Sequence, residues 1–224
     1  MITLHHLEYS QSFRILWLLE ELGADYGLET YERESATLLA PAAYKARSPT
    51  GAAPFITDGE LVLAETSAIV DYLLDKYPND ALRPLPSGEN RARHLFWSHT
   101  AQGSMTPILM MDSVFRIICA RVPFFLRPLI GAIFKRVNEG FVLPRLAALL
   151  DRAEADLGSA PWFGGDALST ADILLSYPME CASMRGYLTD SYPGCRGWLE
   201  RIYAYPSFVV AKRKDGKPSM VLPL

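Results

Sequence analysis

Residues 48–73 read SPTGAAPFITDGELVLAETSAIVDYL, and two short apolar runs in this segment flank the pair Asp58-Gly59. An Asp-Gly pair between apolar runs is a strong signal for a tight β-hairpin, so residues 54–57 and 61–64 are predicted to be neighbouring strands. Residues 67–77 follow with apolar side chains at helical spacing. The segment therefore predicts a hairpin that leads directly into a helix.

The residues before this hairpin alternate between strand and helix patterns. Residues 2–7 form a short apolar run, and residues 29–33 are a second strand candidate. Between them, apolar residues from Ile15 to Leu22 recur at helical spacing, and Gly23 closes the pattern. The predicted order is β-α-β-(α)-β-β-α.

The residues after the hairpin and its helix show a different sequence pattern, without strand signals. Residues 78–90, PNDALRPLPSGEN, hold three prolines and a glycine, which is typical of a linker. Almost everything beyond is helical in pattern. We therefore expect an α/β domain over residues 1–79, a linker over 80–90 and an all-helical domain over 91–224. The helices are expected at residues 91–111, 117–140, 143–157, 170–187 and 198–203.

Composition excludes several classes of function. The 224 residues carry 22 Lys plus Arg against 25 Asp plus Glu, a formal net charge of −3, so nucleic acid is not an expected partner. The start MITLHHLEYS is unlike a signal peptide, and the most apolar stretch, residues 122–134, is too short to span a membrane. The three cysteines and four histidines show no metal-ligand spacing. We expect a cytoplasmic protein without a bound metal.

Three turns carry candidate functional residues. Ser10 and Ser12 lie where the first helix begins, near backbone N–H groups that favour an anion, although either serine also fits a simple helix cap. Pro54 enters a strand, and a cis bond before it would leave the Ala53 backbone free to pair with an extended ligand.

In the third turn, Glu65 and Thr66 lie where a strand meets a helix. They could hold the ammonium and carboxylate of an amino acid, or Thr66 could act only as a cap.

Several motifs in this order resemble the cytosolic glutathione S-transferases. They are SxSxR at residues 10–14, WLLEELG at 17–23, SPxGxxP ending at Pro54 and ETxAI at 65–69. Residues 127–157 resemble the helical domain of a bacterial and fungal, serine-type branch, and Ser169 to Asp172 match the capping box of the family. The resemblance runs from Ile2 to about Phe208, and it implies a thioredoxin-like N-terminal domain.

The resemblance implies glutathione as co-substrate and assigns the candidate residues. Ala53, before the cis-proline Pro54, would pair with the cysteinyl backbone, and Glu65 and Thr66 would hold the γ-glutamyl end. Ser10 is the first candidate for the hydroxyl that donates a hydrogen bond to the sulfur, and Tyr9 and Ser12 are the lower-ranked candidates. Many members carry Lys where this chain has Ala52, which implies either weaker binding of the glycine end or help there from Lys45 or Arg14.

The resemblance also places the second substrate. The family lines its electrophile pocket with the first helix of the second domain. On or near this helix the chain has Phe96, Trp97, Thr100, Ser104, Met110 and Met111. An aromatic stripe at this spacing is also typical of a helix core. The implied protein is a homodimeric, detoxifying transferase that conjugates glutathione to a small apolar electrophile. A glutathione peroxidase and a non-catalytic glutathione binder are the alternatives.

Overall fold

The N-terminal part of the computed structural model, which describes residues 1–222, is a four-stranded sheet in the order β2-β1-β3-β4. Strand β1 (Ile2–Leu7) is parallel to β2 (Tyr26–Tyr31) and antiparallel to β3 (Phe55–Asp58). The hairpin predicted around Asp58-Gly59 is present, because β3 pairs with β4 (Leu61–Ala64) in antiparallel register.

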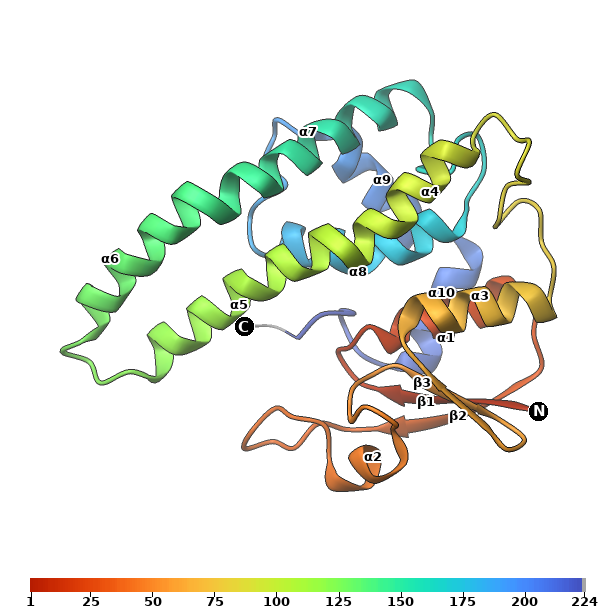
Figure 1. The fold of residues 1–224 in the computed structure, drawn as a ribbon, viewed down its shortest axis with the longest axis horizontal. Helices are drawn as coiled ribbons and strands as arrows, with labels where there is room; N and C mark the ends of the chain where they lie inside the picture. The colour runs from red at the N-terminus through yellow and green to blue at the C-terminus, as the bar shows by residue number, and fades with distance from the viewer. Residues whose placement is uncertain (223–224) are drawn as a thin grey trace.

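Helices cover both faces of the sheet (Figure 1). Helices α1 (Ser12–Glu21) and α3 (Thr66–Lys76) lie on one face, and the short helix α2 (Ala42–Arg47) lies on the other. Tyr44 of α2 packs edge-on against Phe55 of β3. This βαβαββα unit confirms the predicted thioredoxin-like fold class of the N-terminal part.

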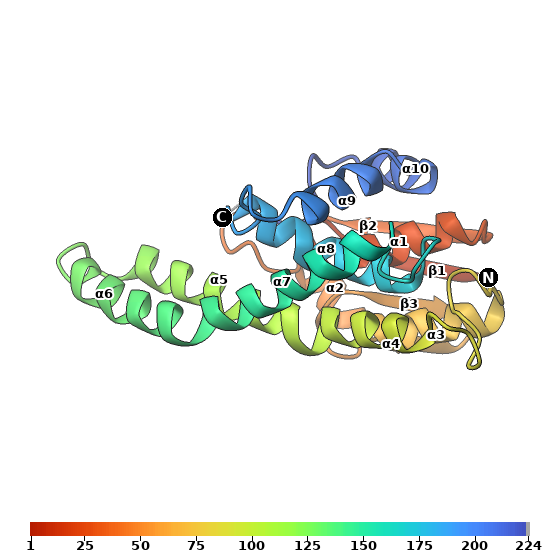
Figure 2. The ribbon, with the colours of Figure 1, turned by 90° about the horizontal axis from the view of Figure 1, so that it is seen from above.

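The rest of the chain is helical, with two long antiparallel rods formed by α4 to α5 and α6 to α7 (Figures 1 and 2). A π-helical turn interrupts each rod. The elements are α4 (Arg91–Thr100), the π-helical turn η1 (Ala101–Met105), α5 (Thr106–Arg121), α6 (Arg127–Val137), the π-helical turn η2 (Asn138–Val142), α7 (Leu143–Ser159), α8 (Thr170–Met184), α9 (Pro193–Tyr203) and α10 (Pro206–Asp215).

Both π-helical turns have the same cause in the sequence. Pro107 follows η1 and Pro144 follows η2, each as the second residue of the next α-helix. A proline has no N–H to donate, and its ring clashes with the carbonyl four residues earlier in a regular α-helix. In both rods that earlier residue is a glycine, Gly103 or Gly140. The wider turn removes the clash without breaking the rod.

The run Arg91–Arg121 is long and apolar enough to cross a membrane by length and composition alone. Core helices of soluble proteins share this length and composition. Trp97, Ala101 and Met105 of this run are buried against the rest of the protein.

Several predicted elements differ from the structure. The helix expected at 91–111 continues to Arg121, the helix expected at 198–203 begins at Pro193, and α10 was not predicted. The strand expected at 29–33 is β2 at Tyr26–Tyr31, where Ile2 of β1 pairs with Tyr26. The helix expected at 117–140 is split at residues 122–126. Val122 is extended because the following Pro123 disfavours a helical conformation for it.

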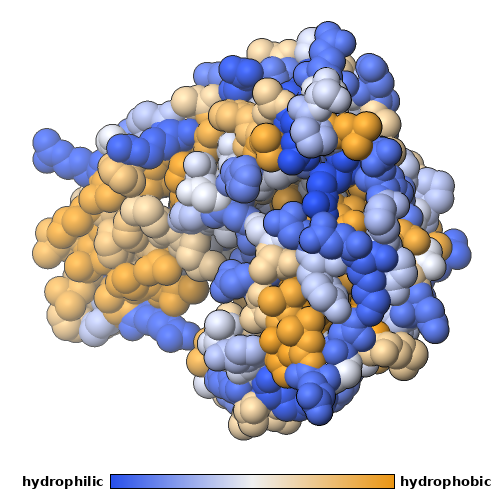
Figure 3. Space-filling view, turned by 45° about the vertical axis from the view of Figure 1, so that its right-hand side comes forward, coloured by the Kyte–Doolittle hydropathy of each residue, from blue (hydrophilic) through white to orange (hydrophobic). Residues whose placement is uncertain are grey.

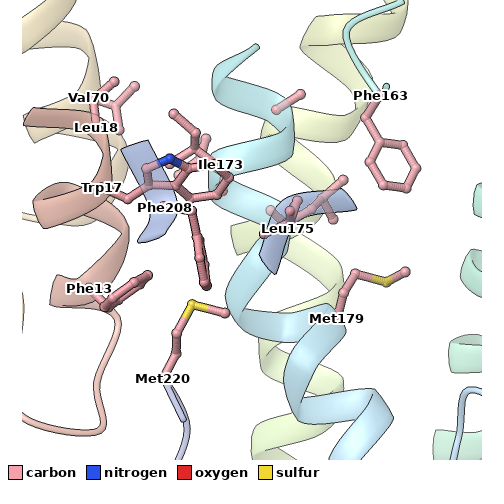
Figure 4. Close-up of a cluster of buried hydrophobic side chains, with 14 of the residues drawn as sticks. Phe13, Trp17, Leu18, Val70, Phe163, Ile173, Leu175, Met179, Phe208 and Met220 are labelled. Carbon is pink, nitrogen blue, oxygen red and sulfur yellow. The ribbon is translucent and has the colours of Figure 1, made fainter. Parts of the chain in front are cut away.

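The core joins the two parts of the chain (Figure 4). Phe13 and Trp17 of α1 contact Phe208 of α10 in edge-on geometry. The Trp17 indole N–H also donates to the Ser207 hydroxyl at 2.8 Å. Ile173 and Met179 of α8 belong to the same buried cluster. The sheet domain therefore has no separate hydrophobic core on its α1 side.

The predicted capping box is present at the start of α8. The buried Asp172 carboxylate accepts hydrogen bonds from the Ser169 N–H at 3.0 Å and the Ser169 hydroxyl at 2.9 Å. It also accepts from the Phe163 N–H at 2.8 Å and the Trp198 indole at 2.9 Å. Burial raises the pKa of Asp172, and these four donors oppose that shift.

Because α8 packs against α1 and α4, Asp172→Ala should destabilise the whole protein. Removal of the carboxylate leaves these four donors and the Gly164 N–H, which lies 3.4 Å from it, without their acceptor in the core. We therefore expect a loss of about 3 to 5 kcal/mol in the free energy of unfolding. Urea denaturation followed by tryptophan fluorescence measures this loss. The exposed Asp166 gives the matched control, since Asp166→Ala should change stability by less than about 0.5 kcal/mol. Equal losses in both variants would contradict the role of Asp172.

Candidate functional site

A polar cavity of about 210 Å³ lies where the sheet domain meets the helical rods. It brings together the three turns singled out in the sequence. Its walls are formed by Gln11, Thr50, Ala52, Ala53, Pro54, Glu65, Thr66, Gln102 and Thr106.

The peptide bond between Ala53 and Pro54 is cis. Within residues 1–222, the N–H and carbonyl of Ala53 take part in no hydrogen bond, although β3 begins only two residues later. An extended, peptide-like ligand could therefore pair with the Ala53 backbone in the manner of an added strand.

On the opposite wall, α3 begins at Thr66 with its first backbone N–H groups facing this turn. The N–H groups of Thr66 and Ser67 make no hydrogen bond within the described residues. Glu65 precedes them in a left-handed conformation, with φ of 75°, which is strained for a residue with a side chain. The helix start suits a carboxylate, and the exposed Glu65 side chain suits an ammonium group.

Arg14 lies fully buried behind this cavity. Its guanidinium donates to the Leu174 carbonyl of α8 at 2.7 Å and to Gln102 Oε1 at 3.1 Å. It also donates to Gln11 Oε1 and approaches the Thr66 hydroxyl at 3.4 Å. None of these partners is a carboxylate. Burial lowers the pKa of Arg14 to about 9, so the group keeps its positive charge at neutral pH.

Ser10 and Ser12 belong to a buried chain of polar groups that leads away from the cavity. The two hydroxyls lie 2.8 Å apart, and Ser12 Oγ lies 2.8 Å from Nδ1 of His6. His6 Nε2 lies 2.9 Å from Asp215, whose other oxygen accepts from Lys212 at 2.9 Å. The chain ties the turn before α1 to the end of α10.

The Ser10 hydroxyl points into this buried chain. It donates to the Leu7 carbonyl at 2.7 Å and also accepts from the Ser12 N–H at 3.2 Å. Gln11, not Ser10, is the N-cap residue of α1, and its side chain forms no capping hydrogen bond. Ser10 does not line the polar cavity, whereas its neighbour Gln11 does. Tyr9, in a left-handed conformation with φ of 48°, lines the next cavity.

This second cavity, of about 170 Å³, shares Thr106 with the polar cavity. We name it the tyrosine–arginine cavity. It is lined by Tyr9, Arg33, Thr106, Leu109, Met110, Ser113, Ile117, Tyr177, Pro178, Cys181, Arg185, Val221 and Leu222. Burial raises the pKa of the Cys181 thiol to about 11, so this cysteine is not a thiolate at neutral pH.

Of the six residues that the resemblance places in the electrophile pocket, Met110 lines the tyrosine–arginine cavity, and the other five line neither this cavity nor the polar cavity. Trp97 is enclosed in the core, where its indole N–H donates to Asp156 at 2.8 Å. Phe96 and Ser104 are exposed, and Thr100 is buried.

The cavity residues that sequence reasoning missed are Gln11, Gln102, Arg33, Tyr177 and Arg185. Gln11 lies within the SxSxR motif, which did point to its position. The other four had no local signal, because only the folding of distant segments brings them together. Within residues 1–222 no group of three or more His, Cys, Asp or Glu side chains could hold a metal ion.

Arg14→Met tests whether the polar cavity is the site for glutathione, the ligand that the sequence resemblance implies. The change removes the donor that holds Gln11, Gln102 and Thr66, together with the positive charge behind the helix start. We expect the dissociation constant for glutathione, measured by calorimetry, to rise about 10-fold or more. Arg145→Met is the matched control, because Arg145 is exposed and donates only to the Phe141 carbonyl. An unchanged constant in a folded Arg14→Met protein would contradict this role.

Comparisons with known proteins agree with this architecture. Residues 4–89 match the glutathione S-transferase N-terminal domain, and residues 128–206 match the C-terminal domain. The chain is similar to glutathione S-transferase 3 of Schizosaccharomyces pombe, with 29% identity over 96% of this chain and 88% of that protein.

Two solved structures are similar over nearly their whole length. A glutathione S-transferase from Actinobacillus pleuropneumoniae has a TM-score of 0.78 and 30% identity, covering 96% of this chain and 93% of the other. A glutathione transferase from Phanerochaete chrysosporium, in complex with oxidized glutathione, has a TM-score of 0.72 and 17% identity, covering 97% of each chain, and shows the fold alone. The two domain matches and the likeness along the whole chain establish that this protein belongs to the glutathione S-transferase family.

Proposed function

We propose that this enzyme binds glutathione in the polar cavity and bonds the glutathione sulfur to an electrophilic carbon held in the tyrosine–arginine cavity, so that the whole glutathionyl group is transferred. The observation that carries the proposal is the meeting of three groups in one cavity. These groups are the unpaired Ala53 backbone, the start of α3 with Glu65 and Thr66, and the start of α1. Together they suit a γ-glutamyl peptide with a thiol at its centre.

The γ-glutamyl end has partners for both of its charges. Its carboxylate would accept from the Thr66 hydroxyl and the N–H groups of Thr66 and Ser67, and its ammonium would pair with Glu65. The cysteinyl residue would pair with the Ala53 backbone. At the glycine end Lys45 is better placed than Arg14, because Arg14 is buried, whereas Lys45 Cγ lies 3.9 Å from the position that a Cβ on Gly51 would occupy.

The sulfur would then lie at the start of α1. The backbone N–H groups of Ser10 and Gln11 make no hydrogen bond within residues 1–222, and the helix dipole adds a partial positive charge there. Lowering the pKa of a free thiol from about 8.5 by about two units corresponds to about 2.7 kcal/mol of thiolate stabilisation.

Ser10 is our first candidate for the hydroxyl donor to the sulfur, although its hydroxyl now points inward. Rotation of its side chain would turn the O–H toward the cavity. The Leu7 carbonyl would keep a donor after this rotation, because Ser12 Oγ lies 3.0 Å from it. Tyr9 is the second candidate, since it lines the tyrosine–arginine cavity.

We also propose that the enzyme is a cytoplasmic homodimer. The part of the chain after α4 exposes many large apolar side chains, which gather at the left of Figure 3. Phe124 is 79% exposed, Phe125 67% and Leu129 61%. Exposed apolar patches of this kind mark protein interfaces. We name this surface the apolar arm; it comprises Met111, Val114, Ile118, Phe124, Phe125, Leu126, Leu129, Ile133 and Val137.

A thiolate titration tests the proposed activity. Ultraviolet absorbance near 240 nm of the glutathione complex, followed from pH 5 to 9, should give a bound-thiol pKa about two units below that of free glutathione. Ser10→Ala should return this pKa toward the free value and lower kcat, while Tyr9→Phe should leave both nearly unchanged. The reverse order would assign the hydroxyl to Tyr9. An unshifted pKa in the wild-type complex would contradict a transferase.

Sedimentation velocity tests the dimer. The double variant Phe125→Ser with Leu129→Ser should sediment as a monomer at micromolar concentration, because it removes two large apolar side chains from the apolar arm. Lys135→Ser, a change on the exposed polar side of α6, is the control and should leave the dimer intact. A wild-type protein that sediments as a monomer would refute this assembly.

A further inference from the structure

The tyrosine–arginine cavity has a charge that a purely apolar electrophile would not need. Two guanidinium groups, Arg33 and Arg185, line it, and no acidic side chain among the described residues does. Its other walls are mostly apolar or aromatic, such as Leu109, Ile117 and Tyr177. Burial of a cation is costly unless hydrogen bonds or an opposite charge compensate it.

Arg33 has only backbone carbonyls as partners for its guanidinium. Nε donates to the Glu8 carbonyl at 3.0 Å, Nη1 to the Leu38 carbonyl at 2.9 Å and Nη2 to the Tyr9 carbonyl at 3.1 Å. These three bonds fix the plane of the guanidinium. Since arginine has five N–H donors, two remain for another acceptor. The nearby Glu8 carboxylate is itself paired with Lys217 at 2.5 Å.

Arg185 reaches the cavity from the end of α8. Its Nη1 donates to the Leu109 carbonyl at 2.5 Å and lies 3.3 Å from the Asp112 carboxylate. Asp112 is shared with Arg116, whose Nε lies 2.9 Å away. The Asp112 carboxylate therefore pairs with both Arg185 and Arg116, and these three side chains together keep a net charge of one positive unit.

The tyrosine–arginine cavity lies beside the polar cavity, so its two guanidinium groups are near the proposed site of reaction. The cavity adjoins the polar cavity at Thr106, so the thiolate and the two guanidinium groups would face a bound electrophile from different sides. The Val221 and Leu222 side chains form part of the same enclosure. A charged group in such a restricted site interacts more strongly with a cation than it would in bulk water.

We propose that the second substrate is an electrophile that carries a carboxylate or a similar anionic group, which Arg33 and Arg185 bind. This inference rests on the proposed glutathione transfer at the same site. For an aryl chloride, the glutathione thiolate attacks the ring carbon that bears chlorine, the C–S bond forms, and chloride leaves. The thiol proton passes to solvent before attack, and no oxidant or further reactant takes part.

A matched pair of electrophiles tests the proposal: 4-chloro-3,5-dinitrobenzoate and its neutral methyl ester. The rates of enzymatic conjugation are divided by the uncatalysed rate of each compound, which removes the difference in their reactivity. We expect the corrected kcat/KM to favour the carboxylate about 10-fold or more. Arg33→Gln should lower this preference about 10-fold, consistent with the loss of one charge-assisted hydrogen bond.

Three further variants separate charge recognition from structural support. Arg33→Lys keeps the positive charge and should retain most of the preference. Arg185→Gln should also reduce it. Arg93→Gln is the matched control, because Arg93 likewise donates to backbone carbonyls, those of Phe163 and Trp162, but lies outside the cavity. A loss in Arg33→Gln that is equal for both electrophiles would overturn the proposal.

Binding of the two products gives a readout that does not depend on turnover. Calorimetry should show that the S-aryl glutathione with a free carboxylate binds more tightly than its methyl ester, and that Arg33→Gln removes the difference. If both electrophiles are conjugated without preference and both products bind equally, the proposal of an anionic substrate is refuted, whereas the proposed glutathione transfer is not. Failure to conjugate either electrophile, together with no binding of glutathione, would refute the proposed function as well.

Discussion

The buried guanidinium of Arg14 sets the relation between the two parts of the chain. It comes from α1 of the sheet domain, yet it donates to the Leu174 carbonyl of α8 and to Gln102 of η1 in the helical part. A cation without a carboxylate partner tolerates burial only when several acceptors surround it. Gln102 also lines the polar cavity, as do the other two acceptors, Gln11 and Thr66, whereas Leu174 does not. One side chain therefore both joins the two parts of the chain and holds three residues of the cavity wall.

The sequence predicted the elements whose signals are local. The Asp58-Gly59 hairpin, α1 and the capping box at Ser169 are visible because turn chemistry and periodicity act over a few residues. The walls of the second cavity were not predictable in this way. Helical periodicity shows which face of a helix is apolar, but it does not distinguish a face in the core from one that borders a cavity. Trp97 illustrates this, because its place in the aromatic stripe suited a pocket wall, yet its side chain is enclosed in the core.

A second reason lies in residues that are distant in sequence but share a function in space. Arg33 follows β2, and Arg185 follows α8, so nothing in either neighbourhood predicts the other. Ser12, His6 and Asp215 form a similar case. Their hydrogen bonds follow the order of a Ser-His-Asp triad, but all three are buried, so no substrate reaches the serine. The arrangement ties the turn before α1 to the end of α10.

The π-helical turn η1 bears on how such a protein could acquire new substrates. The turn accommodates one more residue than an α-helical turn would, just before α5. Deletion of a single residue there, with replacement of Pro107, would close the wide turn into a regular α-helix and leave α5 close to its present orientation, because the wide turn absorbs the extra residue. Leu109, Met110 and Ser113 would therefore keep their places in the cavity wall. One codon gained or lost at this point could change the short segment around Gln102 and Thr106, where the two cavities meet, during evolution while leaving the remaining fold in place.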